Sequence, residues 1–365
     1  MKTIPVRLKE RSYSIYVSGR LLERAGSLLK SLSIGKDAVI ITNKKISGLF
    51  GGSLSRSLEK SGFSVRSFFV PDSETAKSER VARSLFTRIS EYNKKRSLFI
   101  VALGGGVVGD LAGFVASVYR RGIPYIQAPT TFLAQIDSSI GGKVAIDLPA
   151  AKNLIGSFYQ PKLVLSDPSL LKFLPKRQFA SGLSELIKYG VIKDRRLFGY
   201  IERNYLKISR CDKRALEYVI GRAAAIKASV VERDEYDRKD LRVILNYGHT
   251  IGHAIEAASK YGRAYTHGEA VAVGMVVANE MAVRLCLLRE KEAARIKALL
   301  ENVGLPTTIG KGLSLDRIIS AHYSDKKFVG KTNKFVLPTA IGSVKVLSNV
   351  PVSVIRGSLK KRYSS

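Results

Sequence analysis

Cysteine, acidic residues and long apolar runs are all scarce in this chain of 365 residues. The two cysteines, Cys211 and Cys286, stand far from each other and from the histidines, so they form no metal-ligand pattern. Such sparse use is typical of a reducing cytosol. No uninterrupted apolar run opens the chain, which predicts no signal peptide, and no apolar stretch is long enough to span a bilayer. We therefore expect a cytoplasmic protein without a membrane partner.

The shortage of acidic residues leaves a large positive charge. The chain has 61 lysines and arginines against 30 aspartates and glutamates, a formal net charge of +31. Nucleic-acid binding through phosphate contacts is one explanation, but the basic residues are spread along the chain, without a basic tail or a motif of that class. Steering of an anionic substrate explains a positive cleft but not the whole excess. We favour a bias toward basic surfaces across the lineage and expect no nucleic-acid partner.

Two kinds of pattern divide the chain. In the first half, apolar runs at 38–42, 97–103 and 125–128 alternate with helical patterns such as the one over 78–93. This alternation predicts a Rossmann-like α/β domain with a mostly parallel sheet, which we place at 1–175.

The second half has a different character. From about 178 to 305 the patterns are long and helical, with few strand signals, while 334–338 and 342–347 are suited to a hairpin. We therefore expect a mainly α-helical domain over 176–365. Three clustered histidines fall within it, which is why we expect it to be the metal-binding domain.

A glycine-rich segment follows the second apolar run. Gly104, Gly106 and Gly109 have the spacing G-x-G-x-x-G, directly after an expected strand and at the start of an expected helix. That context lets backbone amides approach a pyrophosphate. No acidic residue follows about 20 residues later, and the turn is not in the first strand–helix unit. We interpret it as the phosphate-binding turn of a dinucleotide site outside the ordinary Rossmann pattern, with a purely structural tight turn as the alternative.

Three of the four histidines, His249, His253 and His267, fall within 19 residues. The first two are four residues apart and therefore share one face of a helix. Because Thr250 follows His249 where a zinc protease has its general-base glutamate, that protease class is excluded. The cluster indicates a metal or acid–base site, and spacing alone favours His249 and His253 as the pair of ligands. The alternative is a pair of helix histidines bonded to neighbouring carbonyls.

Seven segments occur in the order found in one enzyme family: 104–114, 121–122, 127–131, 137–143, 152–153, 184–190 and 245–256. Together they resemble 3-dehydroquinate synthase, and the resemblance extends from about residue 36 to residue 343. It implies a lyase that uses NAD and a divalent metal, usually zinc with cobalt as an alternative. The reaction would convert 3-deoxy-D-arabino-heptulosonate 7-phosphate into 3-dehydroquinate and phosphate, a step of the shikimate pathway toward aromatic amino acids. It also implies a homodimer.

The resemblance assigns roles to individual residues. The metal ligands would be Glu185, His249 and His267, with His253 as a proton-transfer group beside them, Asp137 close to the substrate ring, and Arg121 reaching the phosphate in the neighbouring subunit. Groups that hold the substrate's carboxylate, phosphate and hydroxyls would be Lys143, Lys152, Asn153, Lys188, Lys227, Arg242, Asn246 and Lys326 or Lys327. The NAD side would consist of Asp72, Glu74, Lys77, Gly104, Gly105, Gly106, Asp110, Thr130 and Thr131, together with Lys143 and Lys152.

Three positions depart from the family pattern. Phe173 replaces a threonine near the cofactor, Ser73 replaces a glycine, and Asn43 replaces an aspartate whose oxygen an amide can imitate. The alternatives are another sugar-phosphate cyclase, a related metal-dependent alcohol dehydrogenase that would release NADH, and a basic nucleic-acid-binding protein built on the same scaffold. A nucleic-acid-binding protein would not need the expected metal ligands Glu185, His249 and His267, so their presence counts against that alternative.

Overall fold

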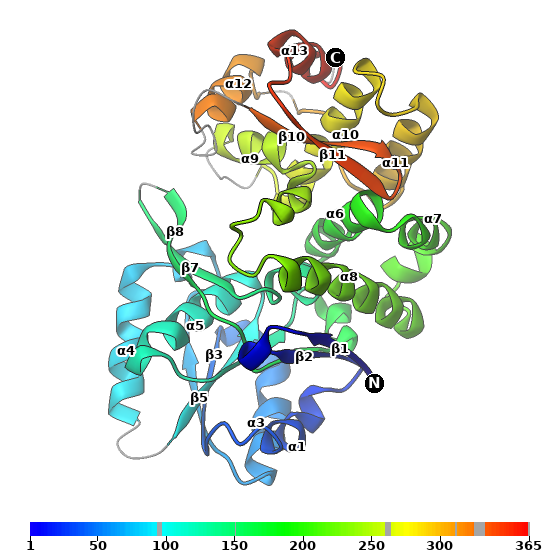
Figure 1. Cartoon of the computed structure of the whole chain (residues 1–365). Coiled ribbons are helices and arrows are strands. Elements are labelled where there is room, and N and C mark those ends of the chain that lie inside the picture. The colour runs from blue at the N-terminus through cyan, green and yellow to red at the C-terminus, as the bar shows by residue number, and fades with distance from the viewer. Residues whose placement is uncertain (93–96, 150, 260–263, 311, 325–332, 364–365) are drawn as a thin grey trace. The chain divides into compact units, whose positions relative to one another are not determined.

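The computed structural model in Figure 1 describes residues 1–365 except 93–96, 150, 260–263, 311, 325–332 and 364–365. The chain forms two compact units. The first contains Met1–Leu174 and Lys213–Tyr236, and the second contains Pro175–Asp212 and Asp237–Ser365. Among the described residues, no helix has both the length and the apolar character that a membrane crossing requires.

The first unit is built on a seven-stranded sheet in the order β1-β2-β9-β6-β5-β3-β4. Only the β1–β2 pair is antiparallel. Strand β5, in the interior of the sheet, is buried along its whole length, as expected for a strand that is covered on both faces. The strands are β1 (Lys2–Val6), β2 (Tyr13–Val17), β3 (Asp37–Thr42), β4 (Ser64–Phe69), β5 (Leu98–Gly104), β6 (Tyr125–Pro129) and β9 (Leu163–Ser166).

Two apolar clusters flank this sheet. One packs α4 and α5 against β3, β4 and β5, and the other packs α1 and α3 against β3, β5, β6 and β9. A hairpin of β7 and β8 lies against α5, and helix α8 packs on β1. The bounds are α1 (Ala25–Lys30), α2 (Lys44–Ile46), α3 (Gly52–Lys60), α4 (Glu79–Tyr92), α5 (Gly106–Val118), β7 (Lys143–Leu148), β8 (Ala151–Phe158) and α8 (Lys213–Arg233).

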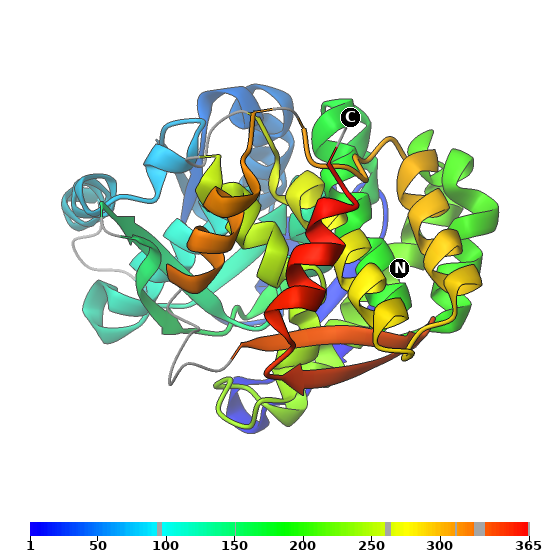
Figure 2. The same cartoon turned by 90° about the horizontal axis from the view of Figure 1, so that it is seen from above.

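The second unit is helical around one buried helix, α10, which packs against α6, α9, α11, α13 and β10. Figure 2 shows α13 and the antiparallel hairpin of β10 and β11 in orange to red. The bounds are α6 (Lys176–Lys193), α7 (Arg195–Ser209), α9 (His249–Ala258), α10 (His267–Arg284), α11 (Glu290–Asn302), α12 (Leu315–Ser324), β10 (Lys334–Ala340), β11 (Ser343–Ser348) and α13 (Val352–Lys360).

Short turns of 3-10 or π-helix complete both units: η1 (Lys9–Arg11), η2 (Leu22–Arg24), η3 (Ser47–Gly51), η4 (Glu74–Ala76), η5 (Tyr119–Arg121), η6 (Ala134–Ser138), η7 (Pro168–Phe173) and η8 (Leu241–Asn246). The η6 turn is π-helical and carries one of the expected site residues, Asp137.

The predicted fold class is confirmed, with a mostly parallel sheet in one unit and helices in the other. The late hairpin is also found where the sequence indicated it. The two units divide the chain at 174/175, one residue before the boundary placed from the sequence, and α8 returns to the first unit. The apolar face of α8 packs on β1, which lies more than 200 positions earlier in the sequence. Local helical periodicity does not reveal a contact between residues so far apart.

Candidate functional site

The three clustered histidines stand at the starts of two neighbouring helices. His249 is the first residue of α9, His253 follows one turn later, and His267 is the first residue of α10. Gly248, before α9, has a φ of 79°. A Cβ there would lie 2.5 Å from Met275 Cγ, so only glycine lets the start of α9 lie this close to α10.

Glu185 on α6 faces two of these imidazoles. Its Oε1 lies 3.4 Å from His249 Nε2 and 3.9 Å from His267 Nε2. The side chain is only 1% exposed, yet neither carboxylate oxygen accepts a hydrogen bond from a described residue. Lys188, one helical turn along α6, pairs with Oε2 as an ion pair without hydrogen-bond geometry. A buried carboxylate that accepts no hydrogen bond lowers the stability of the folded state unless a further partner, such as a metal ion, binds its oxygens.

The hydrogen bonds on the far side of each ring leave both Nε2 atoms facing Glu185. His249 Nδ1 lies 3.2 Å from the carbonyl oxygen of Tyr247, and His267 Nδ1 lies 3.3 Å from Oε2 of Glu256. With the proton on Nδ1, each ring donates outward and presents a lone pair inward, the usual arrangement behind a metal-ligating histidine.

The two rings differ in how readily they accept a second proton. Burial, reinforced by the nearby Lys188 charge, lowers the pKa of His249 well below its ordinary value, so this ring is neutral. Burial also opposes the charged form of His267, but the hydrogen bond that its Nδ1 donates to Glu256 outweighs burial and raises the pKa of His267. One carboxylate oxygen and two imidazole nitrogens within 4.8 Å of one another form a donor set suited to zinc or cobalt.

His253 lies outside the group that contains Glu185. Its ring centroid is 5.3 Å from that of His249 and 6.0 Å from that of His267, and it shares a second possible ligand group with Glu256 and His267. Sequence reasoning missed Glu256, although it lies three residues after His253 and so on the same face of α9.

Two more expected residues of the second unit lie on η8, which packs against α6. Arg242 is buried, with 5% of its surface exposed, and the half-buried Asn246 ends the turn. Lys326 and Lys327 lie outside the described residues.

In the first unit, Lys227 on α8 meets Asp137 on η6. Lys227 Nζ donates to the backbone carbonyl of Asp137 at 2.9 Å and forms an ion pair with its carboxylate. The lysine is buried, so the pair is well shielded from solvent. The sequence separates these two residues by 90 positions, and their contact arises because α8 returns to the first unit.

Lys77 is the centre of a second polar cluster. Its Nζ donates to Asp110 Oδ2 at 2.8 Å and to Asn153 Oδ1, and lies 3.9 Å from both Glu74 Oε1 and Asp147 Oδ1. Burial disfavours the Lys77 charge, but Asp110 outweighs it, and the pKa of Lys77 is raised.

Two further pairs lie beside this cluster. Lys152 lies 3.6 Å from Glu74, and Asn43 donates to Asp72 at 2.7 Å. Asp147, which sequence reasoning missed, accepts a hydrogen bond from the backbone amide of Asn153 at 2.7 Å and so holds that asparagine in place.

The glycine turn joins β5 to α5 at the carboxyl edge of the sheet. Gly104 ends β5, Gly105 is the N-cap, and α5 begins at Gly106. A Cβ on Gly105 would lie 2.9 Å from Thr131 Cγ2, so the turn packs directly on the segment after β6. Thr130, in that segment, donates its amide to Gly104 at 2.9 Å. The carboxyl edge of parallel strands, beside a helix N-terminus, is where dinucleotides bind in open α/β sheets.

The remaining expected residues lie apart from these clusters. Arg121 is exposed and forms no ion pair with any residue that the structure describes, and Lys143 opens β7 on its exposed side. Phe173 is 59% exposed and packs edge-on against Phe50, while Ser73 is the extended N-cap of η4.

Comparison with known proteins shows which family the sequence matches. A model described as 3-dehydroquinate synthase N-terminal matches residues 67–181, and one described as 3-dehydroquinate synthase C-terminal matches residues 182–328. A 3-dehydroquinate synthase of Desulforamulus reducens is 45% identical over 96% of this chain and 97% of its own. One of Pelotomaculum thermopropionicum is 45% identical over 100% of this chain and 97% of its own.

Solved structures with the same architecture include two cyclases. A 2-deoxy-scyllo-inosose synthase with carbaglucose-6-phosphate, NAD+ and Co2+ has a TM-score of 0.89 at 28% identity, covering 99% of this chain and 100% of its own. The 2-epi-5-epi-valiolone synthase of Streptomyces hygroscopicus, with NAD+ and Zn2+, has a TM-score of 0.88 at 26% identity, covering 97% and 98%. An iron-containing alcohol dehydrogenase, with a TM-score of 0.66 at 14% identity over 96% and 97%, shares the fold.

Proposed function

The chain belongs to the 3-dehydroquinate synthase family, and on that premise we propose that it converts 3-deoxy-D-arabino-heptulosonate 7-phosphate into 3-dehydroquinate and phosphate. NAD would be reduced and reoxidised within each turnover, so the reaction causes no net oxidation. The observation that carries the proposal beyond family membership is the buried carboxylate of Glu185, which accepts no hydrogen bond from a described residue and faces the Nε2 atoms of His249 and His267.

Glu185, His249 and His267 would hold the divalent metal, zinc or cobalt. When bound, the metal and NAD supply a Lewis acid and a hydride acceptor for the reversible oxidation of a ring hydroxyl. Tyr247 and Glu256 would keep the two rings oriented through their Nδ1 atoms.

Proton transfer and charge stabilisation would come from other side chains that the family resemblance assigns to the substrate. His253, half-buried beside His249, would move the proton that phosphate elimination requires. Cationic and amide side chains would bind the acid, phosphate and hydroxyl groups through charge-assisted hydrogen bonds: Lys143, Lys152, Asn153, Lys188, Lys227, Arg242 and Asn246. Asp137 would approach the substrate ring, with Lys227 holding it in place.

The nucleotide would bind at the carboxyl edge of the first unit's sheet. The bare backbone of Gly104, Gly105 and Gly106 and the N-terminus of α5 suit its phosphates. The polar residues around this edge that would contact the cofactor are Asp72, Glu74, Lys77, Asp110, Thr130, Thr131, Lys143 and Lys152. The Lys77 bonds to Asp110 and Asn153 would fix this side of the site before the nucleotide arrives.

The active assembly would be a cytoplasmic homodimer without a nucleic-acid partner. The exposed Arg121 guanidinium has no ion-pair partner among the described residues, which supports a role in contact with another molecule. We assign it to the phosphate of the substrate in the neighbouring subunit.

The decisive experiment follows phosphate and NADH together. The purified protein is incubated with the heptulosonate phosphate and a catalytic amount of NAD. We expect phosphate in proportion to the substrate consumed and no lasting NADH absorbance. Accumulation of NADH without phosphate would instead indicate a dehydrogenase, and phosphate release only from a hexose 6-phosphate would indicate another cyclase.

A further inference from the structure

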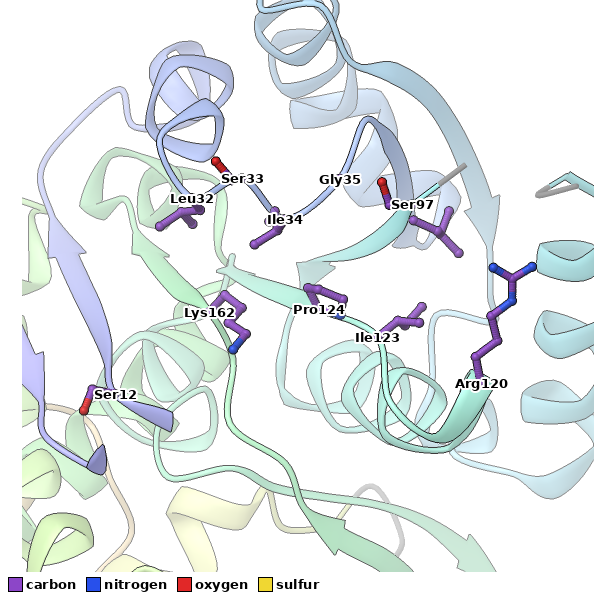
Figure 3. A pocket seen from close by; sticks show the side chains of 11 residues that line it. Ser12, Leu32, Ser33, Ile34, Gly35, Ser97, Arg120, Ile123, Pro124 and Lys162 are labelled. Atoms are coloured by element: carbon purple, nitrogen blue, oxygen red, sulfur yellow. The ribbon is translucent and has the colours of Figure 1, made fainter. Parts of the chain in front are cut away.

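A cavity of about 560 Å³ lies at the amino-terminal edge of the sheet in the first unit (Figure 3). Several of its lining residues immediately precede strands that are parallel neighbours in the sheet: Ser12 precedes β2, Ser97 precedes β5, Pro124 precedes β6 and Lys162 precedes β9. The glycine turn is at the opposite end of β5, and a strand of this length spans about 20 Å. The cavity is therefore separate from the nucleotide-binding edge.

The lining combines positive charge with apolar surface. Arg120 and Lys162 are its cations, none of its residues is acidic, and neither cation forms an ion pair with a residue that the structure describes. Figure 3 shows the two cations on opposite sides of Ile123 and Pro124. Serine hydroxyls at 33 and 97 add hydrogen-bonding groups, whereas the Ser12 hydroxyl already donates to the carbonyl oxygen of Lys9. A recess of this size with polar groups around an apolar surface has the character of a small-molecule site.

The loop that carries Arg120 is held in an uncommon conformation. Arg120 and Arg121 have φ values of 51° and 64°, and Gly122 follows at 122°. Left-handed backbone at consecutive arginines is unfavourable and persists only where the surroundings enforce it. Here the Ile123 amide donates to Ala116 and the Ile123 carbonyl accepts from the Tyr159 hydroxyl, both at 2.9 Å. The Arg120 backbone is thus fixed before any ligand arrives, which reduces the ordering cost of binding.

We propose that this cavity is a second ligand site, which binds a small organic anion. Its phosphate or carboxylate group would contact Arg120 or Lys162, and its apolar body would cover Ile123 and Pro124. The proposal does not depend on the reaction assigned to the chain, because none of these four residues belongs to the proposed metal, substrate or NAD groups.

The test uses phenyl phosphate and benzoate as probes, titrated calorimetrically into the full-length protein. The variant combines Arg120→Asn, chosen because asparagine tolerates left-handed backbone, with Lys162→Gln. The control combines Lys30→Gln with Lys60→Gln, which removes the same charge from exposed positions of the same unit. Probe bound by the proposed active site is common to all three proteins and cancels in the comparison.

We expect the wild type and the control to bind at least one probe alike, and the cavity variant to bind it about tenfold more weakly, the loss expected for a charged contact. The more tightly bound probe identifies the preferred head group. Phosphate release should be equal in all three proteins, and equal melting temperatures show that the variant is folded. Equal binding by the variant and the wild type, or no saturable binding by any of them, overturns the proposal.

Discussion

His267 stands between two carboxylates: its Nδ1 lies 3.3 Å from Oε2 of Glu256 on α9, while its Nε2 faces Glu185 on α6. Glu256 therefore decides which nitrogen of the ring carries the proton. An imidazole whose Nδ1 is held by a carboxylate has a more basic Nε2 and a fixed orientation, and both properties strengthen metal binding. This contact joins Glu256, near the end of α9, to the first residue of α10.

Replacing Glu256 by glutamine should weaken metal binding without abolishing it. The Glu256→Gln amide can still accept from Nδ1, but the negative charge is lost, so we expect an affinity about ten- to a hundredfold lower. Competition with a chelator measures this change. Glu290→Gln, which removes an exposed carboxylate at the start of α11, is the control and should leave the affinity unchanged. An unaltered affinity in Glu256→Gln would assign this glutamate a structural role only.

The ligand assignment separates His267 from His253. We expect His267→Ala to lose the metal, because Glu185 and His249 alone make a poor site. His253→Ala should keep the metal and lose turnover, because it removes the proposed proton-transfer group. Metal analysis of the two purified variants and an assay of phosphate release decide this. A metal-free His253→Ala together with a fully loaded His267→Ala would reverse the assignment.

The sequence could predict features that depend on local pattern. Alternating apolar runs located β3, β5 and β6, and glycine spacing located the turn before α5. Periodicity cannot show which distant helices meet. The spacing of His249 and His253 favoured that pair, whereas the structure places His249 and His267 around Glu185, because α6, α9 and α10 pack together. Only the family resemblance pointed to Glu185.

Other features of the fold and the site could not be predicted because they depend on exposed strands or on contacts between distant residues. The β7–β8 hairpin was missed because β8 is exposed along most of its length and lacks the alternation that identifies a half-buried strand. The contact between Lys227 and Asp137 depends on the return of α8 to the first unit. Glu256 and Asp147 act through hydrogen bonds to other side chains or amides, and no spacing rule encodes such contacts.

Close packing of α9 on α10 should make Gly274 intolerant of a side chain. A Cβ there would lie 2.0 Å from the carbonyl oxygen of Gly248, the residue directly before His249. We expect Gly274→Ala to lower the free energy of unfolding by about 1–3 kcal/mol and to weaken metal binding, since relief of the overlap must move the start of α9. Urea unfolding and chelator competition measure the two effects.

Gly199→Ala is the matched control for this change. On α7 the new Cβ would meet only the end of the flexible Arg203 side chain, at 3.3 Å. Because alanine is the better helix former, we expect this variant to be more stable by up to about 1 kcal/mol. Equal stability losses in the two variants would show that the contact between Gly274 and Gly248 is not responsible.

The negative charge of Glu280 should hold the C-terminal segment in place, and protonation at low pH should remove this stabilisation. Glu280 on α10 is 7% exposed and accepts hydrogen bonds from Lys361 and Arg362 at 3.0 Å and from Arg284 at 3.3 Å. Burial alone would raise its pKa, but these cations outweigh burial and hold the pKa of Glu280 below its ordinary value of 4.5. Because the folded-state pKa is the lower one, the stabilisation is complete above the unfolded-state pKa and is lost as the pH falls through the folded-state value.

Glu280→Gln should therefore be less stable than the wild type near neutral pH, by about 1 kcal/mol, given that the partner cations are partly exposed. The difference should narrow as the pH falls below about 4.5. Urea unfolding at a series of pH values measures it, with Glu290→Gln as the control. A stability difference that does not change with pH would show that the Glu280 charge contributes nothing.

Arg121 provides the sharpest test of the dimeric active site. Arg121→Ala should greatly reduce phosphate release and leave NAD binding nearly unchanged, because the residue is assigned to the substrate phosphate alone. His253→Ala should also be inactive. If Arg121 acts on the neighbouring subunit, a dimer of one chain of each variant contains one complete site, with His253 from one chain and Arg121 from the other. A purified mixed dimer should therefore have about half of the wild-type sites, and random pairing of equal amounts of the two chains about a quarter. Co-expression with two purification tags, followed by the phosphate assay, measures this recovery. An inactive mixed dimer would show that Arg121 serves its own subunit.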